Sequence, residues 1–159
     1  MARVQWPPMA GARRSRPVAL KSSTNGHRQS TNGRGPSGRR SKLGVVDYTL
    51  AKRALLREWR RGVLSRLEIC DAHPELLRAA RYLGAEARRP CPVCSQHELR
   101  LLAYVYADGL RRNNGRAFEV EEGLALASQQ RGGACYIVEV CTYCNWNHLA
   151  EAFLARSAG

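Results

Sequence analysis

The 159-residue sequence predicts an α+β fold in which helices come first and strands follow. Three observations carry this prediction. Apolar residues recur at helical spacing in residues 45–86. Residues 99–107 and 134–140 are rich in aromatic and branched side chains, as strands are. Two Cys-x-x-Cys motifs, about fifty residues apart, enclose both of these strand-like segments.

The two cysteine motifs predict a metal centre. They are Cys91-Pro92-Val93-Cys94 and the pair formed by Cys141 and Cys144. A Cys-x-x-Cys turn can direct two thiolates at one tetrahedral zinc ion, at about 2.3 Å each. Two such turns complete the coordination and leave no open position, so we expect a structural Zn²⁺. Turn, strand, strand and turn closed by a metal form a zinc ribbon, which we place in residues 87–159.

Two other interpretations of the cysteines compete with zinc. A pair of disulfides would need an oxidising compartment, and no secretory signal is recognisable, so we expect a cytoplasmic protein. A thioredoxin-like redox motif is typically a single Cys-x-x-Cys beside a βαβ pattern, which is not seen.

Residues 1–44 are strongly basic and low in complexity. They hold ten of the 26 lysines and arginines and none of the 13 acidic residues, which makes them the source of most of the net charge of +13. Residues 45–159 hold the other 16 bases and all 13 acids, a balance of only +3. We expect a disordered tail, which is either a basic arm that binds phosphate groups or a dispensable extension.

The helical subdomain is predicted in residues 45–86. Its first helix spans residues 45–62, with Asp47 as N-cap and an apolar stripe that includes Leu50 and Trp59. Its basic residues are either a solvated face or a surface for phosphate or an acidic partner. They are Lys52, Arg53, Arg57, Arg60 and Arg61.

Two shorter helices should follow, one capped by Ser65 and one beginning at Pro74. Three helices permit a DNA-reading helix-turn-helix, but the second connection lacks the usual glycine. That connection contains Cys70-Asp71-Ala72-His73, which is either a buried thiol with a capping histidine or a source of metal ligands. The candidate alternative or second-site ligands are Cys70, His73, Cys135 and His148.

Around the ribbon strands, residues 86–90 are expected to be a linker and residues 108–116 a loop. Arg111, Arg112 and Arg116 make this loop a candidate phosphate contact, although an ordinary solvated loop has the same composition. Residues 119–130 read as an inserted helix and residues 149–156 as a final amphipathic helix. Trp146 is expected either to stack on a base or to pack over the metal site.

Four motifs together resemble one actinobacterial family of small proteins classed as a domain of unknown function. They begin at Val46 (Val-Asp-Tyr-x-Leu-Ala), Cys70 (Cys-Asp-Ala-His-Pro), Arg89 (Arg-Pro-Cys-Pro-Val-Cys) and Cys141 (Cys-x-x-Cys-x-Trp-Asn-His). The resemblance covers about residues 45–155. It implies a cytoplasmic bacterial protein with a structural cysteine site, and it implies no established activity.

We therefore expect a non-catalytic accessory protein of the gene-expression machinery. It would bind RNA polymerase, the ribosome or their nucleic acids through the ribbon and the basic elements, an expectation that rests partly on analogy. A protein-interaction scaffold without nucleic-acid contact is the alternative. A thiol-dependent enzyme or redox sensor that uses Cys70, Cys135 or a labile zinc site is a third class. No Ser-His-Asp set, phosphate loop or run of 18 apolar residues is present in the sequence.

Overall fold

The structure is a computed structural model that describes residues 43–155. The predicted tail therefore lies outside the described residues, except for Leu43 and Gly44, which open the first strand. In the described part, no helix is long and apolar enough to span a membrane.

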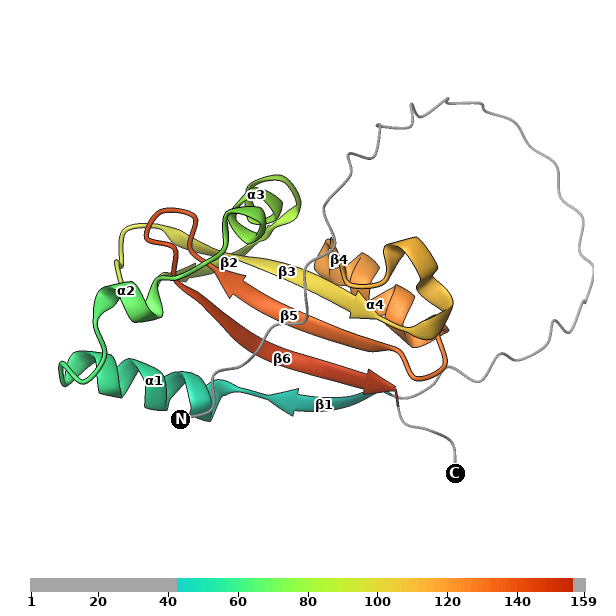
Figure 1. The fold of residues 1–159 in the computed structure, drawn as a ribbon, viewed down its shortest axis with the longest axis horizontal. Helices are drawn as coiled ribbons and strands as arrows, with labels where there is room; N and C mark the ends of the chain where they lie inside the picture. Colours follow the sequence, from blue (N-terminus) through green and yellow to red (C-terminus); the bar gives the residue numbers. More distant parts are fainter. Residues whose placement is uncertain (1–42, 156–159) are drawn as a thin grey trace, which may run out of the picture.

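One antiparallel sheet organises the described chain, with strand order β1-β6-β5-β3-β2 and β4 paired to β3 (Figure 1). The predicted combination of helices and strands is confirmed. The strands are β1 (Leu43–Asp47), β2 (Ala85–Pro90), β3 (Glu98–Tyr106), β4 (Arg116–Phe118), β5 (Ala134–Val140) and β6 (Asn147–Ala155). The helices are α1 (Thr49–Arg60), α2 (Arg66–Ile69), α3 (Pro74–Leu83), the 3-10 segment η1 (Asp108–Asn113) and α4 (Val120–Gln129).

The strands β3 and β5 are largely buried, because their side chains alternate between two faces and a helix covers each face. On one face, Leu102 and Val138 pack against Leu76 and Ala80 of α3. On the opposite face, α4 covers the end of the sheet at which β5 begins. Its approach is close: a Cβ added to Gly123 would lie 2.4 Å from the Cβ of Ala103. Only glycine fits this contact without a shift of the helix.

The first helix begins later than the sequence indicated, so the prediction of a helix over residues 45–62 is wrong at its start. Residues Leu43–Asp47 instead pair with β6, with Val45 opposite Phe153. Branched residues pack well in such a ladder. The N-cap is Tyr48 rather than the predicted Asp47, although the Asp47 carboxylate accepts the N–H of Thr49, the first helical residue, at 2.5 Å. The Thr49 hydroxyl and N–H lower the pKa of this carboxyl.

The two short helices have the caps that the sequence predicts. Ser65 and Glu68 form a reciprocal capping box at α2. At α3, His73 Nδ1 accepts the N–H of Glu75 at 3.3 Å, and Pro74 is the first helical residue. Both predicted caps are confirmed. They could be predicted because a cap depends on residues that are close in sequence.

Two other segment predictions are wrong. Residues 86–90 form most of the edge strand β2, and the described part of the predicted last helix, residues 149–155, is a strand. Alanine, leucine and glutamate give the last segment helix propensity, yet Asn147–Ala155 is β6. It lies between β5 and β1 and pairs with both. Pairing along both edges overrides the local preference.

Candidate metal centre

The first Cys-x-x-Cys motif forms a compact turn between β2 and β3. The N–H of Cys91 donates to the carbonyl of His97 at 2.8 Å, and the N–H of Ser95 donates to the carbonyl of Cys91 at 2.9 Å. Ser95, the residue after the second cysteine, has a φ of 55°. This left-handed residue reverses the chain and brings both thiols to one side of the turn.

The second motif repeats this backbone pattern between β5 and β6. The N–H of Cys141 donates to the carbonyl of Trp146 at 2.8 Å, and the N–H of Asn145 donates to the carbonyl of Cys141 at 3.1 Å. Asn145 again follows the second cysteine and has a φ of 65°. Asparagine tolerates this conformation better than most residues. We call the two turns the first and second knuckles.

The knuckles bring their four thiols into one cluster. The sulfurs of Cys91 and Cys144 are 3.6 Å apart, and those of Cys94 and Cys141 are 3.7 Å apart. All four ligand atoms lie within 4.8 Å of one another. Tetrahedral thiolates at about 2.3 Å from a metal would be about 3.8 Å apart. The spacing therefore fits a tetrahedral metal ion, and all four cysteines are free rather than disulfide-bonded.

Backbone N–H groups that point at these sulfurs favour their thiolate form. The N–H of Val93 lies 3.4 Å from the sulfur of Cys91. Burial raises the pKa of the Cys94 thiol, but the N–H groups of Gln96 and His97 and the neighbouring thiols outweigh burial and bring its pKa to about 7. In the other three thiols burial dominates and raises the pKa: Cys91, Cys141 and Cys144. A bound metal would have to displace those protons.

An apolar shell surrounds the cluster. Leu56 of α1, Ile69 of α2 and Leu99 of β3 pack with the ligand cysteines and with Trp146, which is fully buried. Across the two knuckles, the rings of His97 and Tyr143 stack with centroids 4.3 Å apart. The centre therefore joins α1, α2 and both knuckles in one core.

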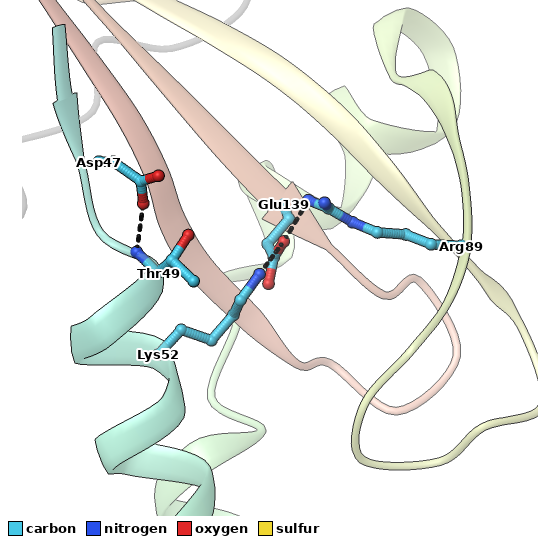
Figure 2. A network of polar contacts seen from close by, with 5 residues as sticks. All are labelled: Asp47, Thr49, Lys52, Arg89 and Glu139. Atoms are coloured by element: carbon cyan, nitrogen blue, oxygen red, sulfur yellow. Dashed lines mark hydrogen bonds and ion pairs between the residues drawn. The ribbon is translucent and has the colours of Figure 1, made fainter.

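A buried carboxylate lies next to the centre, two residues before Cys141. Glu139 is fully buried, and its Oε2 accepts from Lys52 of α1 at 3.0 Å and from Arg89 of β2 at 2.7 Å (Figure 2). Sequence reasoning missed this network. The available signal was an acid within the apolar run Ile137–Val140 of a buried strand.

Three buried polar atoms have no hydrogen-bond partner among residues 43–155: Glu139 Oε1, Trp146 Nε1 and His148 Nδ1. Glu139 and His148 are direct cross-strand partners, and the His148 ring stacks on Trp146 with centroids 5.9 Å apart. Burial lowers the pKa of His148, which the Leu149 backbone and the Glu139 charge only partly oppose.

The predicted alternative ligands do not join the four thiols. Cys135 lies opposite Val105, toward the other end of the sheet, and packs under α4. Burial raises its pKa to about 12. His73 uses Nδ1 to cap α3, and His148 faces the Glu139 network. Cys70 packs beside the four-thiol cluster without being one of its members.

The predicted basic contacts fall into two separate groups. Lys52 binds Glu139, whereas Arg53, Arg57 and Arg60 of α1 and its C-cap residue Arg61 are exposed beside the centre. We call these four residues the α1 arginine row. Arg111 and Arg112 belong to η1 and Arg116 to β4. These segments follow β3 at the opposite end of the sheet, where β4 and α4 lie (Figure 1). Trp146 has no face of its indole free for a base, because it is fully buried.

Fold and site together define a small helix-and-sheet protein with a buried four-cysteine centre that could hold a metal ion. The chain belongs to the family described as "Family of unknown function (DUF5318)", whose model matches residues 38–159.

Similar proteins are actinobacterial. The uncharacterized protein Mb0050 of Mycobacterium bovis is 40% identical over 113 residues, which cover 71% of this chain and 82% of that protein. The uncharacterized protein Rv0049 of Mycobacterium tuberculosis matches with the same identity and coverage. No solved structure matches the chain.

Proposed function

We propose that this protein is a non-catalytic zinc protein. The observation that carries the proposal is the convergence of two equivalent knuckles on one set of four thiols. Thiolate ligands in a tetrahedral arrangement suit zinc, and four protein ligands leave no coordination position for water or substrate. Zinc in this site would stabilise the fold and contribute no chemical step.

The metal has a structural task in this location. The shell around the thiols contains Leu56 of α1 and Ile69 of α2, so the same core that encloses the centre also anchors these helices. Because metal binding and folding are linked in small sites, zinc would hold α1 in place. The α1 arginine row would then be presented on a fixed surface.

We further propose that the α1 arginine row binds the phosphate backbone of a nucleic acid. Arg53, Arg57 and Arg61 are spaced by four residues and therefore share one helix face. A row of exposed guanidinium groups matches the spacing and charge of a phosphate backbone. Together with the zinc-ribbon analogy, this supports an accessory role at RNA polymerase, the ribosome or their nucleic acids.

A cytoplasmic location belongs to the same proposal. All six cysteines are free, and four of them are arranged for a metal rather than for disulfides. Free thiols in this arrangement suit a reducing compartment.

A protein-binding scaffold is the second candidate, favoured by exposed apolar side chains around the same helices. Leu50 of α1 is 77% exposed and Leu67 of α2 is 85% exposed. Large exposed apolar residues next to arginines are typical of protein interfaces. In this case the arginines would contact an acidic protein partner.

The two candidates are distinguished by charge reversal at the two ends of the sheet. Arg57→Glu/Arg61→Glu changes the α1 arginine row, and Arg112→Glu/Arg131→Glu makes the same charge change on exposed residues near α4. Binding of the full chain to a labelled duplex and to single-stranded RNA is measured as salt is varied. Each lost phosphate contact should lower the slope of log affinity against log salt by about one.

We expect the α1 variant to lose affinity at least about tenfold, with a slope lower by about two, and the control to bind like the native chain. Equal loss in both variants would mean unspecific attraction to a basic protein. Partners that copurify after nuclease treatment and are lost only in the α1 variant would support the scaffold instead.

A further inference from the structure

The segment Cys70–His73, which neither the metal site nor the arginine row uses, is bound directly to the second knuckle. The N–H of Ala72 donates to the carbonyl of Asn145 at 3.0 Å. Next to it, the Asn147 side-chain amide donates to the Asp71 carboxylate at 3.0 Å. Two hydrogen bonds thus fix two residues that follow Cys144 against the residues that follow Cys70.

This contact brings a fifth thiol to the centre. Cys70 is only partly buried and packs against the apolar shell of the four ligands. Burial raises the pKa of its thiol, which the neighbouring Cys144 and Arg66 side chains only partly oppose. Cys144 lies 3.6 Å from Cys91, its partner in the cluster, and belongs to the same apolar cluster against which Cys70 packs.

We propose that Cys70 is an oxidisable thiol that forms a disulfide with Cys144 and thereby releases the metal. The inference rests on the proposed occupation of the centre by zinc. In that state Cys144 is a thiolate, since a coordinating thiol is deprotonated by the metal. A nucleophilic sulfur therefore lies next to a partly exposed thiol from outside the coordination set.

The oxidant is hydrogen peroxide. The Cys70 sulfur attacks one peroxide oxygen, the O–O bond breaks, and the Cys70 proton leaves with the other oxygen as water, which gives the sulfenic acid. The Cys144 thiolate then attacks the Cys70 sulfur and displaces hydroxide, which takes a proton from solvent to become a second water. The two cysteines are oxidised by two electrons, the peroxide is reduced, and the metal loses one of four ligands.

The remote cysteine provides a matched control. Cys135 is fully buried under α4, toward the opposite end of the sheet from the knuckles, and belongs to a different apolar cluster. A Cys135→Ser change removes one thiol from the chain but leaves the centre and Cys70 in place. Cys70→Ser and Cys70→Ala remove the proposed partner of Cys144, and the pair of variants guards against misfolding caused by either one.

The test treats the zinc-loaded full chain with hydrogen peroxide and follows two readouts: zinc release to a chromogenic chelator, and disulfides mapped by non-reducing peptide mass spectrometry. We expect a Cys70–Cys144 disulfide that accumulates in step with zinc release and is reversed by a dithiol reductant. Cys135→Ser should behave like the native chain. The Cys70 variants should release zinc several-fold more slowly.

Disulfides confined to the four ligand cysteines, with native release rates in both Cys70 variants, would overturn the inference. A protein that holds no zinc before oxidation would contradict the proposed function instead. The disulfide map distinguishes the two failures, because it reports whether Cys70 and Cys144 pair in chains with and without metal.

Discussion

Arg89 on the edge strand β2 lies 2.7 Å from Glu139 Oε2 on β5, with β3 between the two strands. The same oxygen accepts from Lys52 at 3.0 Å. One buried carboxylate therefore links an edge strand, a central strand and α1 directly beside the metal centre. Because a buried charge is costly unless it is paired, each partner matters for stability.

Removal of the Glu139 carboxylate should destabilise the fold. Glu139→Ala removes two charged hydrogen bonds and leaves a cavity, but Lys52 and Arg89 are partly exposed, so we expect a loss of about 1–3 kcal/mol in the free energy of unfolding. Urea denaturation of the metal-loaded chain measures this loss. Glu121→Ala, an exposed acid on α4, is the control and should stay within about 0.5 kcal/mol. Equal stability of the two variants would mean that the network contributes nothing.

Lys52 should matter more than its neighbour Arg53. Lys52→Met removes one charged hydrogen bond to Glu139 but leaves Arg89 in place, so we expect a loss of about 1–2 kcal/mol. Arg53→Met, on the exposed side of the same helix, should change stability by less than about 0.5 kcal/mol. The same denaturation measurement compares them, and a larger loss in Arg53→Met would contradict the assignment of Lys52 to the network.

The contact of Gly123 with β3 should tolerate no side chain. An added Cβ would lie 2.4 Å from the Cβ of Ala103, so Gly123→Val forces α4 away from the sheet and should cost about 1–3 kcal/mol. Ala125→Leu, at an exposed position of the same helix, is the control. Thermal unfolding followed by circular dichroism measures both. A native melting temperature for Gly123→Val would disprove the close approach.

His148 should make stability depend on pH. Burial lowers the pKa of His148 below its ordinary value of 6.5, so the unfolded chain binds a proton before the folded chain does. The contribution of neutral His148 to the free energy of unfolding is present above pH 6.5, and it declines as the pH falls toward the pKa of His148 in the folded chain. His148→Phe should flatten the unfolding free energy between pH 7.5 and about 6, measured on metal-loaded protein. If the unfolding free energy of His148→Phe depended on pH as steeply as that of the native chain, His148 would not be the cause of the pH dependence.

Local sequence features predicted local structure well. The two Cys-x-x-Cys motifs and the caps at Ser65 and His73 each depend on residues within one turn of the chain, and all of them form as expected. The strands β1, β2 and β6 were missed for a physical reason. Val45 and Phe153 pair across more than a hundred residues, and the local composition of β6 favours a helix.

Of the candidate site, the four cysteines were predictable from the sequence, but the buried network around Glu139 was not. Spacing identified the four cysteines, but nothing local connected Lys52 to Glu139, which are 87 residues apart. The buried face of α1 therefore includes a lysine and Leu56, and the expected stripe residue Leu50 is exposed. Similarly, only the hydrogen bond from Ala72 to Asn145 reveals why Cys70 lies next to the second knuckle.

The most direct test is the zinc content of the full chain, measured by inductively coupled plasma mass spectrometry after expression in zinc-replete cells. We predict one zinc per chain in the native protein and in Cys135→Ser, and almost none in Cys94→Ser or Cys141→Ser. Native protein with well under one zinc per chain, or equal zinc content in all four proteins, would contradict a metal centre at the two knuckles.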